Sequence, residues 1–410
     1  MNSAIVNDYT QKAIKWTLPL ILIGVAVAAS LIPTSAAPFD SPLPPAPNKL
    51  QLSAWMPTSW DGDAARASFD AHSDSLTAIS PYWYSVRPDG SLAPMAGSRD
   101  AGLVNQARAA GVLILPTISN LFERETLHAI LNDAALAEAH RRAIVAEVGR
   151  YGYDGIDLDY ENLAAADKDQ FSAWAAALAD DLHARGKRLT ITVQPKTFDA
   201  DGWNGPGALD YRALAGAADE LRLMTYGWCW SSGCVGSDPP GPIAPVHWMQ
   251  RVIDYAKTQA PASKLVLGVH LYGYDWEVGS NQYSVTSERY SGAVSEDVTG
   301  RALVWEEAQA LQTEHHAALQ WWEADDRGLV REPWFSYAEG AHHVTFADAD
   351  SVAARAQLAA DAGLRGVIFW RLGGEDPALW ERIPKRIYRA WLPILSDGQS
   401  GSKSTHRPTD

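Results

Sequence analysis

Three carboxylates at alternating positions are the feature of this chain best suited to chemistry. Residues 154–161 read DGIDLDYE, so Asp157, Asp159 and Glu161 stand two positions apart. Side chains two apart on a β-strand point to the same face, which would place the three carboxyl groups in one row. Each charge in such a row disfavours the ionisation of its neighbours. The row therefore suits acid catalysis, in which one carboxyl group stays protonated beside others that are ionised.

Two other uses of the row remain open from the residues alone. Three carboxylates suit Mg²⁺ or Ca²⁺, and a row of this kind can also be purely structural and hydrogen-bonded. The histidine pairs at 315–316 and 342–343 have no spacing that makes a convincing ligand set. We expect no metal site and no cofactor.

The amount of charge and of aromatic residues limits the possible partners. The formal net charge of −15 argues against a nucleic-acid binder and against a basic membrane-surface domain. The chain holds 17 Trp and 15 Tyr, whose flat faces stack well on sugar rings or fill a core. In an exported protein this richness suggests a carbohydrate partner.

The N-terminus has the composition of a targeting segment. Lys12 and Lys15 precede an apolar run over 16–33, and small residues follow at 34–37. This pattern predicts a signal peptide or a membrane anchor over 1–37, and hence an exported protein. Residues 38–48 (PFDSPLPPAPN) read as a Pro-rich linker.

The only two cysteines are Cys229 and Cys234, which are close in sequence. Outside the cytoplasm, a short loop between them favours a disulfide over two free thiols.

Apolar, β-rich runs alternate with Ala-rich helical stretches along the chain. This alternation implies a parallel sheet, and eight such units predict an α/β fold of the (β/α)8, or TIM, barrel type over 49–395. Residues 277–346 are too long for a loop and predict a small α+β insertion after the seventh strand, and the polar tail 396–410 is expected to be disordered. The eight runs are Leu50–Met56, Ser75–Val86, Val112–Ser119, Gly155–Glu161, Leu189–Gln194, Leu221–Tyr226, Leu265–Tyr272 and Gly366–Leu372. The clearest helices are Asp133–Tyr151, Asp167–Arg185, Pro245–Gln259 and Ser351–Ala362.

The barrel hypothesis ranks the three carboxylates by depth. Active sites of such barrels form at the carboxyl ends of the strands, and Glu161 closes the fourth run. We therefore expect Glu161 at the substrate, Asp159 in the middle and Asp157 deepest. Tyr84 and Gln194, near the ends of the second and fifth strands, are candidate substrate contacts.

Several motifs together resemble glycoside hydrolase family 18, the chitinase-like enzymes. Residues 154–161 match the DGxDxDxE signature of that family, residues 223–226 (LMTY) resemble its sixth-strand motif, and residues 366–370 (GVIFW) resemble its eighth strand. The resemblance covers roughly 49–383, and residues 159–162 and 271–276 look closest to the branch of bacterial cell-wall and spore-cortex N-acetylglucosaminidases.

The resemblance implies a retaining glycosidase that cuts β-linked N-acetylglucosamine polymers, either chitin or peptidoglycan. It implies that Glu161 protonates the glycosidic oxygen, and that the 2-acetamido oxygen of the substrate attacks C1. Asp159 would hold the acetamido N–H, with Asp157 sharing its charge and proton. Tyr226 would hold the acetamido carbonyl, Met224 in the same motif would contact the substrate, and Trp370 would form the floor of the sugar site.

One position departs from the family pattern. The family usually has Asp after the Tyr of the sixth strand, whereas this chain has Gly227. This leaves substrate preference open and gives weak support to an alternative, a catalytically inactive sugar-binding barrel. A metal-dependent hydrolase on the same barrel is a third possibility.

Overall fold

The computed structural model describes residues 50–200, 202–278 and 299–383. The predicted targeting segment 1–37, the linker 38–48 and the tail 396–410 lie outside these residues, as does part of the predicted insertion. Within the described part, no helix combines the length and the apolar character needed to cross a membrane.

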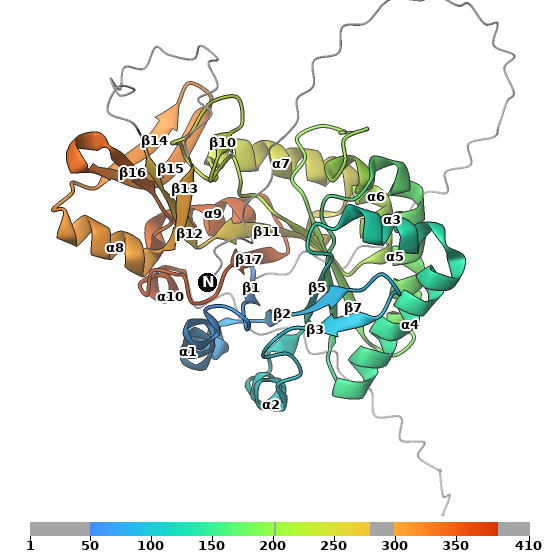
Figure 1. The fold of residues 1–410 in the computed structure, drawn as a ribbon. Helices are drawn as coiled ribbons and strands as arrows, with labels where there is room; N and C mark the ends of the chain where they lie inside the picture. Colours follow the sequence, from blue (N-terminus) through green and yellow to red (C-terminus); the bar gives the residue numbers. More distant parts are fainter. Residues whose placement is uncertain (1–49, 201, 279–298, 384–410) are drawn as a thin grey trace, which may run out of the picture.

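Eight parallel strands close into a barrel, as predicted (Figure 1). The order runs from β1 through β17, β11, β8, β7, β6 and β5 to β2, and β1 pairs with β2 to complete the ring. The third predicted strand is split into two short pieces, β4 (Leu113–Ile114) and β5 (Thr117–Ser119). The remaining barrel strands are β1 (Gln51–Met56), β2 (Ala78–Val86), β6 (Gly155–Asp159), β7 (Arg188–Val193), β8 (Glu220–Leu223), β11 (Leu265–His270) and β17 (Gly366–Trp370).

Helices connect the strands and surround the barrel. The four helices that the sequence predicts most clearly correspond to α4, α5, α7 and α9, with ends shifted by at most a few residues. Asp133 caps α4, because its carboxylate accepts hydrogen bonds from the N–H groups of Ala135 and Leu136. The helices are α1 (Gly62–His72), α2 (Ala101–Ala110), α3 (Arg124–Asn132), α4 (Ala134–Tyr151), α5 (Lys168–His183), α6 (Tyr211–Ala217), α7 (Val246–Gln259), α9 (Ala349–Asp361) and α10 (Leu379–Arg382).

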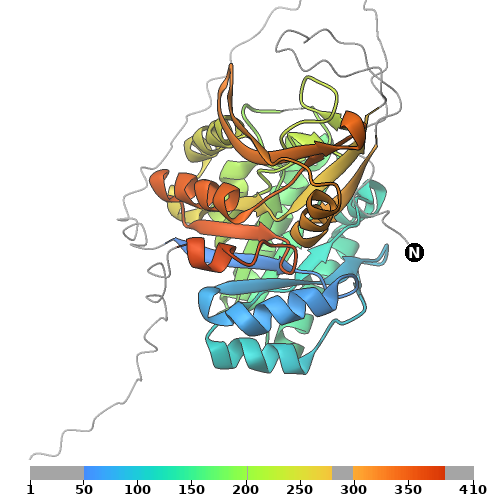
Figure 2. The ribbon, with the colours of Figure 1, turned by 90° about the vertical axis from the view of Figure 1, so that its left-hand side faces the viewer.

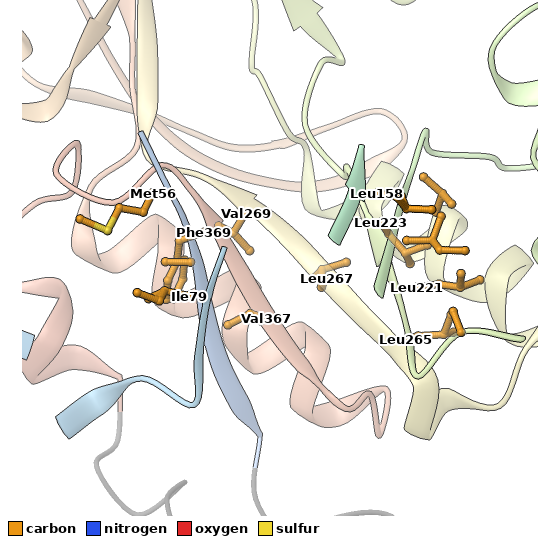
Figure 3. Close-up of a cluster of buried hydrophobic side chains, with 14 of the residues drawn as sticks. Met56, Ile79, Leu158, Leu221, Leu223, Leu265, Leu267, Val269, Val367 and Phe369 are labelled. Atoms are coloured by element: carbon orange, nitrogen blue, oxygen red, sulfur yellow. The ribbon is translucent and has the colours of Figure 1, made fainter. Parts of the chain in front are cut away.

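The main core lies between the strands and this layer of helices. Strand residues that point outward are aliphatic or aromatic, and Figure 3 shows Leu221, Leu223, Leu265 and Leu267 among them. Their neighbours along each strand point into the barrel, which is more polar than the near-continuous apolar runs suggest. Its interior includes Ser53, Ser80, Thr117, Asp157, Thr190, Glu220 and Arg222, all of them buried.

The insertion after the seventh barrel strand is an α+β unit, as predicted. Its antiparallel five-stranded sheet has the order β13-β12-β16-β15-β14. Figure 1 places it (orange) beside β10 and α7, and Figure 2 shows its curved sheet on the side of the barrel away from α1 and α2. Its elements are β12 (Tyr272–Glu277), β13 (Gly300–Val304), α8 (Trp305–Glu314), β14 (Gln320–Asp325), β15 (Gly328–Tyr337) and β16 (His342–Thr345).

Candidate active site

The three carboxylates stand at the carboxyl end of β6, in the predicted order of depth. Asp157 is fully buried, Asp159 is 6% exposed and Glu161 is half-buried. Asp157 is paired in register with Thr117 on β5 and with Thr190 on β7. Because side chains alternate along a strand, Asp157 and Asp159 both point into the barrel. Glu161 follows the end of the strand, at the mouth.

Asp157 is enclosed by hydrogen-bond donors from several barrel strands. Its Oδ2 accepts from Trp55 Nε1 and from the Thr117 hydroxyl, each at 2.9 Å. Its Oδ1 accepts from the Thr190 hydroxyl at 2.7 Å and lies 3.2 Å from Arg222 Nη1. Such a set of donors suits a carboxylate anion fixed in one orientation.

Asp159 has a much poorer set of partners. Its Oδ2 accepts a hydrogen bond from the Tyr82 hydroxyl at 3.3 Å, and its Oδ1 is buried without a hydrogen-bond partner among the described residues. Burial raises the pKa of Asp159 well above its usual value, and the charges of Glu161 and Asp157 raise it further, against the lowering effect of the Tyr82 bond. Asp159 is thus a buried carboxyl group with a raised pKa and with one oxygen that no described residue contacts by a hydrogen bond.

Glu161 is held through its backbone. The side chain of Asn120, just after β5, accepts a hydrogen bond from Glu161 N–H at 2.9 Å and donates one to Glu161 C=O at 2.8 Å. The residue before it, Tyr160, points to the outer face, where its hydroxyl lies 2.6 Å from His140 Nε2. Nothing in the spacing of the sequence singles out Asn120, because it lies in the loop after another strand.

Aromatic side chains surround the carboxylates. Trp370, half-buried at the end of β17, meets Trp55 and Tyr82 edge-on, at ring-centre distances of 5.8 and 5.9 Å. Trp60 meets Tyr82 edge-on at 5.5 Å. The structure therefore brings Trp370 next to the groups that contact Asp157 and Asp159, and it adds Tyr82 and Trp60, which sequence reasoning missed.

Tyr226 lies on the same side of the barrel as Trp370. Both pack against a small inner cluster of Trp55, Val266 and Ile368. Gly268 on β11 leaves room for the Tyr226 ring, because a Cβ at this position would lie 3.1 Å from Tyr226 Cε1 and 2.4 Å from a backbone oxygen. Tyr226 and Trp370, both predicted site residues, thus pack against the same inner cluster.

The structure does not bring Tyr84 to this site. Tyr82 is opposite Thr117 of β5, but Tyr84 is opposite Ile118, so β2 carries one extra residue here. Such a bulge turns the following side chain to the other face. Tyr84 is fully buried outside the barrel, where its hydroxyl shares a hydrogen bond of 2.7 Å with Tyr153. Tyr82 occupies the inner position instead.

The other two predicted contacts lie at the correct end of the barrel. Gln194 follows β7 and is buried, with its side-chain oxygen so close to Gly205 that a Cβ there would lie 2.3 Å away. Met224 follows β8 and is half-buried. Both stay predictions as substrate contacts.

The loop after Tyr226 begins with Gly227, the position at which the residue type departs from the family pattern. Gly227 has φ of 101°, a conformation that a side chain makes costly, and its N–H donates to Ile243 O at 3.1 Å. The following hairpin pairs β9 (Cys229–Trp230) with β10 (Gly233–Cys234) and is closed by the predicted disulfide, with an S–S distance of 2.05 Å. An Asp at position 227 would therefore need a different backbone.

Among residues 50–200, 202–278 and 299–383, no three His, Cys, Asp or Glu side chains are arranged to hold a metal ion.

Known proteins similar to this chain include enzymes of the spore cortex and chitinases. The cortical fragment-lytic enzyme of Bacillus subtilis is 28% identical over 309 residues, which are 74% of this chain and 66% of that protein. The chain thus spans about two thirds of the length of this relative. The structure of the spore cortex-lytic enzyme SleL of Bacillus megaterium has a TM-score of 0.68 and 26% identity, covering 84% of this chain and 76% of that one. A chitinase from Chromobacterium violaceum has a TM-score of 0.67 and 25% identity, covering 82% and 98%.

A sequence model of one protein family matches most of the barrel. The sequence model of glycosyl hydrolases family 18 matches residues 105–375, which include the carboxylate row, Tyr226 and Trp370. This match covers more than half of the chain. The chain belongs to glycosyl hydrolases family 18.

Proposed function

We propose that the protein is a retaining glycosidase that hydrolyses β-linked N-acetylglucosamine polymers, with Glu161 as general acid and base. The observation that carries the proposal is the Asp159 carboxyl group, which is buried beneath Glu161 and whose Oδ1 has no hydrogen-bond partner within the described part of the chain. A buried polar atom without a partner is costly. An acetamido N–H of the substrate would supply the missing hydrogen bond.

The first step separates the leaving sugar. Glu161 donates its proton to the glycosidic oxygen, and the bond from C1 to that oxygen breaks with its electron pair leaving on the oxygen. The 2-acetamido oxygen of the substrate forms the new bond to C1, giving an oxazolinium ion. Asp159 accepts a hydrogen bond from the acetamido N–H, and its carboxylate balances the developing positive charge. This electrostatic stabilisation is strongest in a site from which water is excluded.

The second step restores the enzyme. Glu161, now ionised, takes a proton from water while the water oxygen attacks C1 and the bond from C1 to the acetamido oxygen breaks. Two inversions at C1 give net retention. No enzyme carboxylate forms a bond to the sugar, which is consistent with Asp157 being fully engaged by Trp55, Thr117, Thr190 and Arg222.

The aromatic groups serve to orient the substrate. Trp370 offers a flat, partly exposed face beside Tyr82, whose hydroxyl contacts Asp159, so a sugar ring stacked there would lie near the carboxylates. The Tyr226 hydroxyl is proposed to hold the acetamido carbonyl. Orientation of this kind supplies a large part of the rate enhancement when the nucleophile belongs to the substrate.

Substrate and location are proposed on the same basis. The B. subtilis relative is named for cortical fragments, and the C. violaceum neighbour for chitin. Chitin and peptidoglycan both contain β-linked N-acetylglucosamine, so they are the two candidate substrates. The charged and apolar pattern of 1–37 supports an exported protein, whether that segment is cleaved or retained as an anchor.

The test compares wild type with Glu161→Gln on chitin oligomers and on purified peptidoglycan. We expect cleavage by wild type with the β-anomer as the first product seen by NMR, competitive inhibition by a thiazoline mimic of the oxazolinium ion, and a loss of kcat of at least about 1,000-fold in the variant. Glu125→Gln, an exposed position on α3, is the matched control and should leave kcat unchanged.

The outcomes separate the two candidate functions. Tight binding of the oligomers without cleavage by wild type would support the inactive sugar-binding barrel. Cleavage with an α-anomer as first product, or without thiazoline inhibition, would contradict the participation of the acetamido group.

A further inference from the structure

The hydrogen bonding between β5 and β6 ends just before Glu161. The last paired residues are Ser119 and Asp159, so the peptide groups of Glu161 lie past the end of the ladder. Backbone N–H and C=O groups near a barrel mouth still need partners, and without them the chain end can adopt several positions. The position of the Glu161 carboxyl group therefore depends on what replaces the ladder.

The Asn120 side chain replaces it. Its Nδ2 donates to Glu161 O at 2.8 Å and its Oδ1 accepts from Glu161 N–H at 2.9 Å, and the residue is 3% exposed. A carboxamide is the side-chain group that offers a donor and an acceptor in one plane, as a neighbouring strand would. Asp lacks the donor, and Gln is one methylene longer.

The loop that carries Asn120 is itself fastened to the turn after Glu161. Arg124 Nε donates to Asn162 O at 3.0 Å, and its Nη2 donates to Asn162 Oδ1 at 2.8 Å. Asn162 Nδ2 in turn donates to Phe122 O at 3.2 Å. The two loops thus form one hydrogen-bonded unit around the Glu161 peptide.

We infer that Asn120 is a positioning residue for Glu161, fixing the backbone from which the general acid reaches the glycosidic oxygen. The inference rests on the proposed function. A displacement of a catalytic group by about 1 Å can reduce turnover about 100-fold, while sugar binding on the aromatic groups is little affected. The signature is therefore a fall in kcat with KM almost unchanged.

The experiment measures kcat, KM, the pH profile and the melting temperature of Asn120→Ala and Asn120→Asp. We expect Asn120→Ala to lower kcat about 10- to 100-fold with KM within about threefold of wild type. In Asn120→Asp the added carboxylate disfavours ionisation of Glu161, so the basic limb of the pH profile should move to higher pH. That variant also serves if Asn120→Ala does not fold.

Asn132→Ala is the matched control, because the Asn132 side chain on α3 also takes part in two hydrogen bonds, which it donates to His128 O and to Asp167 Oδ1, both at 2.9 Å. It should leave kcat unchanged. If wild type cleaves and Glu161→Gln does not, but Asn120→Ala keeps full kcat or Asn120→Asp keeps the wild-type pH profile, the inference is overturned and the proposed function stands. A wild type without turnover overturns both.

Discussion

Asp157 and Asp159 are one strand pleat apart, yet their surroundings differ in kind. Asp157 is met by hydroxyl, indole and guanidinium donors, whereas Asp159 has a long hydrogen bond from Tyr82 and an Oδ1 that no residue of the described structure contacts by a hydrogen bond. The first carboxylate stabilises the barrel interior. The second is costly to the fold, which is typical of groups retained for function.

Replacing each with Asn should therefore change stability in opposite directions. The pKa of Asp159 is raised by burial and then by the charges of Glu161 and Asp157, so this group costs stability as pH rises above its ordinary value of 3.8. Asp159→Asn should raise the free energy of unfolding at pH 7, measured with urea, while lowering kcat by about 100- to 1,000-fold. An unchanged kcat would contradict the role of Asp159.

Asp157→Asn is the comparison within the same row. It removes the charge opposite Arg222, which is fully buried and lies 3.2 Å away. Arg222 keeps Glu220 as a second buried partner at 3.4 Å, but it loses the nearer carboxylate, so this variant should be less stable than wild type. Equal stability of the two variants would show that the two carboxylates do not differ in their effect on the fold.

At the scale of elements, the insertion is joined to the barrel by a buried carboxylate. Glu332 on β15 lies 2.9 Å from His270 Nε2 on β11 and 3.0 Å from Arg355 Nη2 on α9. It also accepts hydrogen bonds from the N–H groups of Ile243 and Ala244, in the loop before α7. One side chain thus links four separate parts of the fold.

Glu332→Gln should destabilise the protein by about 3–5 kcal/mol, because Arg355 would keep a buried charge without its counterion. Urea unfolding at pH 7 measures this. Glu323→Gln is the matched control on the neighbouring strand, since its pair with Arg331 is 62% and 48% exposed and should contribute less than about 1 kcal/mol. A loss as small as that of the control would show that the insertion is held by other contacts.

The sequence predicted these elements well and some of their side chains poorly. The strand and helix runs, the insertion and the carboxylate order followed from periodicity and from position on β6. Strict alternation along β2 places Tyr84 inside the barrel, but a bulge after Tyr82 turns Tyr84 to the outer face. The prediction was wrong because a bulge leaves no mark in the residue pattern. Asn120 was missed because its role arises between two loops that are 41 positions apart.

At the scale of the molecule, buried histidines make the fold sensitive to acid. His140 is fully buried, with Nδ1 2.7 Å from Gly90 O and Nε2 2.6 Å from the Tyr160 hydroxyl. A carbonyl oxygen only accepts, so Nδ1 carries the proton and Nε2 accepts from Tyr160, which is the neutral tautomer. Burial lowers the pKa of His140 from 6.5 to about 4, and it lowers that of His343 from 6.5 to about 3.

The direction of the effect follows from these shifts. Below pH 6.5 the unfolded chain binds a proton at each histidine that the folded protein does not, so stability present above this pH is lost as pH falls toward the folded pKa. For His140 alone, the free energy of unfolding should fall by about 2 kcal/mol between pH 7 and pH 5. At pH 5 an ordinary Glu is still mostly ionised, so the buried glutamates contribute little in this window.

The measurement is urea unfolding of wild type and His140→Gln at pH 7 and pH 5. Glutamine cannot take up the proton, so the difference between the two pH values should shrink by about 2 kcal/mol in the variant. Asp159 acts in the opposite direction, because a raised carboxyl pKa adds stability as pH falls, but this contribution is common to both proteins and cancels in the comparison. An equal pH dependence in wild type and variant would show that His140 has the same pKa in the folded protein as in the unfolded chain, against the lowering expected from its burial.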